Sequence, residues 1–89
     1  MTKKQLHEII NDGIGRRKRF FALKIETEGN AAPEIIVNPF ENAAAKMRYI
    51  DAAYNDALEL IKAKESGKSI RIVDAVVGNT LAGLDWFAV

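Results

Sequence analysis

The sequence contains no cysteine and a single histidine, His7, and both shortages exclude kinds of functional site. A chain without thiols forms no disulfide and has no cysteine nucleophile. Structural zinc sites use four cysteine or histidine ligands, which this chain cannot supply. A metal ion would have to bind to carboxylates alone, so we expect no metal and no other cofactor.

Long apolar runs are absent as well, and no stretch approaches the roughly 18 apolar residues of a membrane-spanning helix. The first residues, Met1 to Gln5, lead into an amphipathic stretch rather than into the apolar core of a signal peptide. We therefore expect a cytoplasmic protein that does not associate with membranes.

Catalytic patterns are equally scarce, because neither a nucleophile beside a base nor a glycine-rich phosphate loop is present. His7 adjoins Glu8 on the polar flank of a predicted helix, which is typical of a surface histidine. Asp74 and Asp85 could form a carboxylate pair for acid–base chemistry or for a divalent cation. A guard on an edge strand and a turn cap explain the same two residues more simply. We expect no catalytic residues and no enzymatic activity.

The length of 89 residues favours one domain that spans residues 1–89. A core of this size contributes only about 3–5 kcal/mol beyond its entropy cost, and small domains often add a second copy. The net charge is +1, but the first 24 residues carry seven Lys or Arg against two acids. This polarity suits an acidic partner or head-to-tail contacts between copies.

The residue patterns predict an α+β fold, with a small sheet and helices packed on one of its faces. Thr2 and Gln5 form a capping-box pattern at the start of a short N-terminal helix. Apolar residues then recur at helical spacing until Gly13 and Gly15, which favour a helix end.

Three strands are predicted after this N-terminal helix. Apolar and polar residues alternate from 20 to 27, which predicts a half-buried strand. After a loop at 28–33, the β-branched run 35–37 predicts a second strand that completes a hairpin. A third strand is predicted at 70–77, followed by an apolar tail at 79–89 whose pattern fits either a helix or a strand. The strand order is left open.

A long helix is predicted between the second and third strands. Asn38 can cap it, Pro39 suits its first position, and Glu41 can reach back to the cap. Apolar residues in steps of three or four continue the pattern over residues 39–65, and Gly67 ends it.

The predicted long helix carries more apolar surface than the sheet can cover. About 27 residues span roughly 40 Å, whereas a strand of about six residues spans only about 20 Å. Each large apolar side chain left in water forfeits about 1.5–3 kcal/mol. The first helix or the tail could cover the surplus, but a small chain without disulfides gains most from a second copy, so we predict a homodimer. The predicted self-association surface comprises Tyr54, Leu58, Ile61, Leu84, Trp86 and Phe87.

Clustered cations at Arg16, Arg17, Lys18 and Arg19 form the one stretch that is typical of a nucleic-acid contact. Such side chains neutralise phosphates and release counterions. The same cluster suits the end of a helix, where positive charge offsets the negative end of the dipole. Phe20, next to the cluster, could stack on a base. We keep a nucleic acid as the alternative to an acidic protein partner.

The segments Asn38–Asn42, Tyr54–Asp56 and Ile70–Val73 together resemble small uncharacterised proteins of phages and mobile elements in Gram-positive bacteria. The resemblance covers half of the chain and rests on helix and strand positions rather than on a catalytic motif. It implies an accessory or host-takeover role. The sequence thus predicts a small non-enzymatic interaction module that self-associates through the long helix, the tail or both. The alternative is a nucleic-acid-binding accessory protein.

Overall fold

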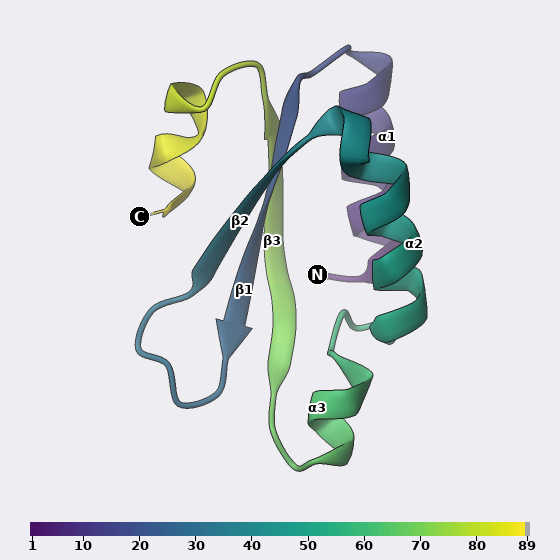
Figure 1. Ribbon diagram of the computed structural model, residues 1–89, viewed down its shortest axis with the longest axis vertical. Helices are drawn as coiled ribbons and strands as arrows, with labels where there is room; N and C mark the ends of the chain where they lie inside the picture. The colour runs from purple at the N-terminus through teal and green to yellow at the C-terminus, as the bar shows by residue number, and fades with distance from the viewer. Residues whose placement is uncertain (89) are drawn as a thin grey trace.

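An antiparallel sheet of three strands forms the centre of the fold, which a computed structural model describes for residues 1–88 (Figure 1). In chain order the elements are α1 (Lys3–Gly15), β1 (Phe20–Thr27), β2 (Glu34–Pro39), the 3₁₀ helix η1 (Phe40–Asn42), α2 (Ala43–Ala53), α3 (Ile61–Glu65), β3 (Ile70–Gly78) and the 3₁₀ helix η2 (Ala82–Ala88). The predicted α+β class and the predicted order of helices and strands are confirmed.

The strand order is β2-β1-β3, so β1 lies in the middle and pairs with both neighbours in antiparallel orientation. β1 and β2 are consecutive in the chain and form the predicted hairpin. α1, α2 and α3 lie on one side of the sheet, and η2 lies on the other (Figure 1). Both β2 and β3 are therefore edge strands.

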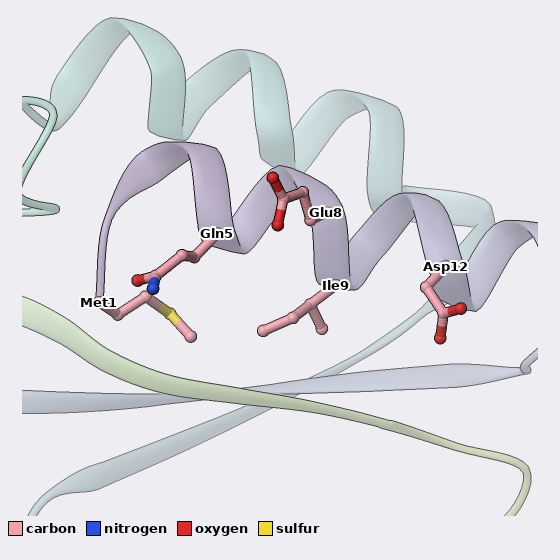
Figure 2. A pocket seen from close by; sticks show the side chains of 5 residues that line it. All are labelled: Met1, Gln5, Glu8, Ile9 and Asp12. Atoms are coloured by element: carbon pink, nitrogen blue, oxygen red, sulfur yellow. The ribbon is translucent and has the colours of Figure 1, made fainter.

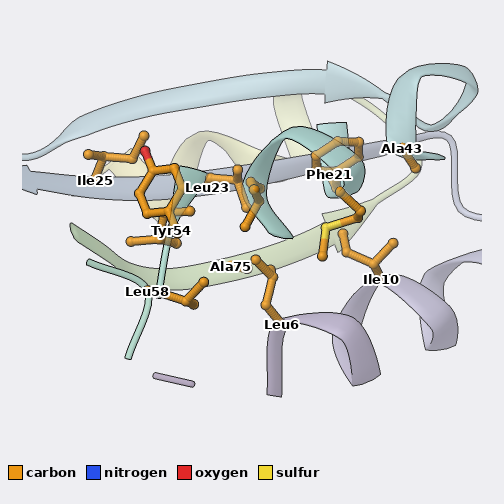
Figure 3. Close-up of a cluster of buried hydrophobic side chains, with 12 residues drawn as sticks. Leu6, Ile10, Phe21, Leu23, Ile25, Ala43, Tyr54, Leu58 and Ala75 are labelled. Carbon is orange, nitrogen blue, oxygen red and sulfur yellow. The ribbon is translucent and has the colours of Figure 1, made fainter. Parts of the chain in front are cut away.

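Alternate side chains of β1 divide the apolar residues between the two faces of the sheet. Phe21, Leu23 and Ile25 face the helices and pack in the main core, shown in Figure 3. Ala22 faces the other way, into a small second cluster under η2. The other members of the main core are Leu6, Ile10, Ala43, Met47, Ile50, Tyr54, Leu58, Ile72 and Ala75.

α1 begins with the predicted capping box. The backbone N–H of Gln5 donates to Thr2 Oγ1 at 3.1 Å, and the N–H of Thr2 donates to Gln5 Oε1 at 2.8 Å. Both bonds satisfy donors that the start of a helix leaves free. Leu6 and Ile10 lie one turn apart and are buried, so this face of α1 packs on the sheet.

Gly13 lies within α1 rather than after its end, because the helix continues to Gly15. A Cβ atom added to Gly13 would collide with the Phe40 ring and would lie 2.9 Å from Val77 Cγ1. The missing side chain therefore allows a close approach between α1, η1 and β3.

The predicted helix start at Asn38 and Pro39 is wrong. Asn38 pairs with Phe21 inside the hairpin, and its side chain caps no helix. The N–H of Phe40 donates to the carbonyl of Arg19 at 2.9 Å, which continues the strand pairing up to the first residue of η1. Strand pairing thus outweighs the local preference of the Asn-Pro pair for a helix start.

The predicted continuous helix over residues 39–65 is also wrong, because α2 ends at Ala53 and a turn precedes α3. In this turn the side chain of Asn55 accepts hydrogen bonds from the backbone N–H of Ala57 at 3.0 Å and of Glu59 at 2.9 Å. Asn side chains compete with the helix for backbone groups in this way. The chain therefore leaves the helix here.

Leu58 turns the chain back onto the sheet. Its φ of 58° lies in the left-handed region, which a bulky residue rarely adopts. The Leu58 carbonyl accepts a hydrogen bond from the N–H of Ile72 at 3.0 Å, and the N–H of Leu60 donates to the carbonyl of Ile70 at 2.8 Å. These two bonds attach the turn to the start of β3.

The turn removes the surplus apolar surface on which the homodimer prediction rested. Tyr54 and Leu58 are 6% and 0% exposed, and both belong to the main core of the same chain. α2 and α3 have 11 and 5 residues, so neither extends far beyond the sheet. Self-association therefore requires another surface.

The C-terminal tail, for which the sequence left helix and strand open, forms η2 as far as residue 88. Its Leu84 and Phe87 side chains are buried against Ala22, on the face of the sheet opposite α1 and α2. The Nζ atom of Lys24 lies 4.7 Å from the centre of the Phe87 ring, which is a cation–π contact. Residue 89 of the predicted tail lies outside the described residues.

Replacing Gly13 with Ala should destabilise the fold although Ala has the higher helix propensity. The new methyl group would overlap the Phe40 ring, so we expect urea denaturation to show a free energy of unfolding lower by about 1–3 kcal/mol. Gly15→Ala is the matched control, because no atom lies within 4 Å of its Cβ position. It should change stability by less than about 1 kcal/mol. Equal effects of the two substitutions would contradict the packing role of Gly13.

Replacing Asn55 with Ala should destabilise the turn between α2 and α3. The substitution removes the bonds to the N–H groups of Ala57 and Glu59, each with a net contribution of about 0.5–1.5 kcal/mol. It also removes the hydrogen bond that, together with Lys64, lowers the pKa of Glu59. We expect urea denaturation to show a loss of about 1–3 kcal/mol, against less than about 0.5 kcal/mol for Asn30→Ala in an exposed loop. A stable variant with a higher helix content by circular dichroism would refute this role of Asn55.

Candidate interaction site

The histidine and one of the two acids singled out in the sequence have separate local partners. His7 Nε2 lies 2.8 Å from Asp51 Oδ1 on α2, and both side chains are half-exposed. Asp74 accepts a hydrogen bond from the N–H of Ala75 at 2.8 Å, and Asp85 lies in η2. Within residues 1–88, no group of three His, Asp or Glu side chains is placed to hold a metal ion.

Most of the predicted self-association surface is inside the molecule. The buried members are Tyr54, Leu58, Leu84 and Phe87, which fill two separate hydrophobic clusters. Ile61 and Trp86 are exposed, by 37% and 64%. They belong to α3 and η2, which lie on opposite sides of the sheet (Figure 1). The six side chains therefore do not form one surface, because the turn after α2 and the packing of η2 separate them.

The basic segment forms the turn between α1 and β1. Arg16 pairs with Asp12 at 3.3 Å, one helical turn earlier. Arg17 has a left-handed backbone with a φ of 55°, and the N–H of Arg19 bonds to the end of β3. Arg17 and Arg19 are exposed, whereas Lys18 is half-buried. In the part of the chain that the structure describes, these three cations form no ion pair.

A hollow of about 470 Å³ lies along one flank of α1 (Figure 2). It is lined by Met1, Gln5, Glu8, Ile9 and Asp12. Glu8 and Asp12 are exposed, so the hollow lacks the enclosed polar groups that orient a small ligand. We assign no ligand to it.

The outer edge of β3 is protected in three ways. The turn between α2 and α3 hydrogen-bonds to Ile70 and Ile72. A β-bulge follows, where the register with β1 shifts and Val73 has no partner. The Asp74 carboxylate then accepts the N–H of Ala75, so this donor is not available to a further strand. Natural proteins use such devices to prevent pairing at a sheet edge, and Asp74 lies where the sequence suggested a guard on an edge strand.

The outer edge of β2 has none of these devices. β2 pairs with β1 alone, in a regular register. No charged residue lies between Glu34 and Pro39, and Val37 in this interval is 42% exposed. Pro33 and Pro39 limit the length of the exposed edge, because proline donates no hydrogen bond to a neighbouring strand.

The hydrogen-bond pattern shows which groups of β2 are unpaired. Paired and outward-facing residues alternate along an antiparallel strand. Phe40 lies opposite Arg19 and donates its N–H to that residue. Asn38, Ile36 and Glu34 therefore direct their backbone N–H and C=O groups toward β1. Ile35 and Val37 direct their N–H and C=O groups outward, away from the sheet.

A shallow, open groove of about 390 Å³ lies beside this edge, between Asn38 and one flank of α2. The α2 flank contributes Ala45, Lys46 and Tyr49, and Asn42 lies at its start. Lys46 Nζ lies 5.6 Å from the centre of the Tyr49 ring. The side-chain nitrogen Nδ2 of Asn38 is enclosed and has no hydrogen-bond partner among the described residues. An enclosed donor without an acceptor costs about 1–3 kcal/mol.

Glu34 lies at the other end of the same edge. It pairs opposite Ile25, whose side chain faces the main core, so Glu34 projects toward the helix side of the sheet. Burial raises the pKa of Tyr54, and the neighbouring Tyr49 and the charge of Glu34 raise it further, which places that carboxylate near Tyr54, the residue that follows α2. Glu34 forms no ion pair within residues 1–88.

No protein-family model matches the chain, and comparisons with curated proteins and with solved structures found no significant match. None of the helices described is both long and apolar enough to cross a membrane. The sequence-based interpretation missed the β2 edge. An uncharged apolar run with Pro33 and Pro39 on either side is the signal that could have indicated it.

Proposed function

We propose that this chain is a non-enzymatic interaction module that binds another protein chain by adding a strand at the β2 edge. The contrast between the two sheet edges supports this proposal. β3 is protected by a turn, a bulge and Asp74, whereas β2 is open between Pro33 and Pro39. Because an open edge is an aggregation hazard, proteins protect the edges that serve no partner. An unprotected edge beside a protected one therefore favours recognition by strand addition.

The β2 edge offers both affinity and selectivity. Ile35 and Val37 each direct one N–H and one C=O outward, and each main-chain bond to a partner contributes about 0.5–1.5 kcal/mol net. Burial of the exposed part of Val37 adds an apolar contribution. The groove beside Asn38 can then distinguish one partner side chain from another.

Other surfaces fit the same role. Among the residues that the structure describes, Trp86 is the most exposed large apolar side chain, and it belongs to the tail for which self-association was predicted. We therefore propose it as a second contact. The resemblance to phage and mobile-element proteins supports an accessory role. The absence of cysteine supports a cytoplasmic location, because the fold needs no oxidising compartment.

Replacing Val37 with Pro should abolish binding at the β2 edge and preserve the fold. Proline lacks the outward N–H of this position and is tolerated at such positions of edge strands. We expect the complexes of the wild-type chain, alone or in bacterial lysate, to disappear in size-exclusion chromatography with light scattering. Leu81→Lys is the control, because it changes another exposed apolar residue outside the sheet. Complexes that survive Val37→Pro, or no complexes in either condition, would contradict the proposal.

Nucleic-acid binding by the basic segment is a second candidate function. Arg17, Lys18 and Arg19 form no ion pair among the described residues, so their charge is free to neutralise phosphates. Phe20 is half-buried beside them and can offer part of its ring to a base. The cluster lies at the opposite end of α1 from its capping box, on a turn that is fixed to β3.

Replacing Arg17 and Arg19 with Gln should weaken binding to a single-stranded oligonucleotide. Each phosphate contact contributes about 0.7 to the slope of log affinity against log salt, so losing two contacts should reduce the slope by about 1.4 in fluorescence anisotropy. Lys62→Gln with Lys68→Gln is the control that removes equal charge near α3. Salt-independent binding, or the same loss in both variants, would exclude this function.

A further inference from the structure

The two ends of β2 complement each other when the strand runs antiparallel to a copy of itself. We infer that the β2 edge binds a second copy of this chain, in a register that places Ile36 opposite Ile36 of the partner subunit. This inference rests on the proposed function of the edge and adds the identity of the partner and its contacts.

Main-chain hydrogen bonding fits this register, and the side chains select it. Within β2, only Ile35 and Val37 direct both an N–H and a C=O outward. When Ile35 bonds to the partner's Val37, and Val37 bonds to the partner's Ile35, all of these donors and acceptors are satisfied. A register that places Ile35 opposite the partner's Ile35 brings Val37 opposite the partner's Pro33. A register that places Val37 opposite the partner's Val37 brings Ile35 opposite the partner's Pro39. Because proline has no N–H, the carbonyl of the residue opposite it stays unpaired there, but the proline carbonyl is paired instead. All three registers therefore have the same number of main-chain bonds, and the side-chain contacts decide between them.

The apolar side chains match in the same register. Ile36 and the partner's Ile36 form a pair without mutual hydrogen bonds, in which the Cα atoms are about 4.5 Å apart and the side chains are closest. Ile36 is half-buried against the main core, so the partner completes its burial. On the other face Val37 contacts the partner's Ile35. Cross-strand pairs of this kind contribute to sheet stability.

The polar ends of β2 also match. Glu34 lies opposite the partner's Asn38, and both side chains project toward the helix side. After a rotation of the amide about its last side-chain bond, the Asn38 nitrogen that lacks an acceptor can donate to this carboxylate. Lys46 lines the groove beside Asn38, so the same carboxylate gains an ion pair. Symmetry provides the contact twice.

Pairing of β2 with the partner's β2 covers the open edge of the sheet in both copies. Antiparallel pairing in one sheet implies a two-fold axis perpendicular to the sheet. The two β2-β1-β3 sheets become one, and both helix layers lie on the same side of it. The flanks of α2 that carry Lys46 and Tyr49 then face each other across the axis. Only the protected β3 edges remain at the ends of the sheet.

Cysteine cross-linking tests the register directly, because the chain has no native cysteine. Ile36→Cys places the thiol next to the symmetry axis, at a spacing that a disulfide can bridge. Val37→Cys is the control, because it lies about 7–8 Å from its own copy in this register. Under mild oxidation we expect Ile36→Cys to form disulfide dimers about tenfold faster than Val37→Cys on non-reducing gels.

A charge exchange tests the contact of Glu34 without changing the core. Glu34→Lys should weaken self-association about tenfold, because it places two cations together beside the partner's Asn38. Adding Lys46→Glu should restore the affinity to within about threefold of wild type in sedimentation velocity. Glu8→Lys on α1 makes the same charge change at a distant exposed position and should leave the affinity unaltered.

The outcomes separate this inference from the proposed function. A chain that stays monomeric at millimolar concentration, but forms complexes in lysate that Val37→Pro abolishes, has another partner at the same edge. A dimer that cross-links through Val37, or that tolerates Glu34→Lys, uses a different register or surface. Either result overturns the inference alone. A chain that forms no complex in either condition overturns both.

Discussion

The hydrogen bonds that join Leu58 and Leu60 to the start of β3 determine much of the remaining structure. They fold the chain back after α2, bury Tyr54 in the core and divide a long apolar segment into two short helices. They also occupy the β3 edge just before the bulge, so that β2 is left as the open edge. Without this attachment the middle of the chain would present its apolar surface to solvent, and the β3 edge would keep only the bulge and Asp74 as protection.

Local patterns account for most elements of the fold. The capping box at Thr2 and the alternation along β1 each have one physical interpretation, and both are present in the structure. Asn38 was misinterpreted because its preference for a helix start is weaker than its pairing with Phe21 across the hairpin. The break after Ala53 was missed because apolar spacing continues through it. Asn55 was the signal, since its side chain satisfies backbone groups only when the chain turns.

The candidate site could not be predicted because it depends on which strands lie at the edges. Ile35 to Val37 have the pattern of a strand in any position of a sheet, and strand order is a property of the whole fold. Pro33 and Pro39 indicate a bounded edge only once β2 is known to lie outside β1. Asp74 was easier to interpret, because a charged residue within an apolar strand suggests an edge strand without knowledge of the strand order.

Position 58 restricts how this sequence can vary. The left-handed backbone costs a bulky residue about 1–2 kcal/mol and would suit Gly. Gly would also empty a fully buried site, and large-to-small changes in a core cost about 2–5 kcal/mol. Because the cost of the empty site exceeds the backbone strain, Leu is favoured against the local backbone preference. A homologue with Gly at this position would have to carry a bulkier side chain at a neighbouring core position, so substitutions at these sites should occur together during evolution.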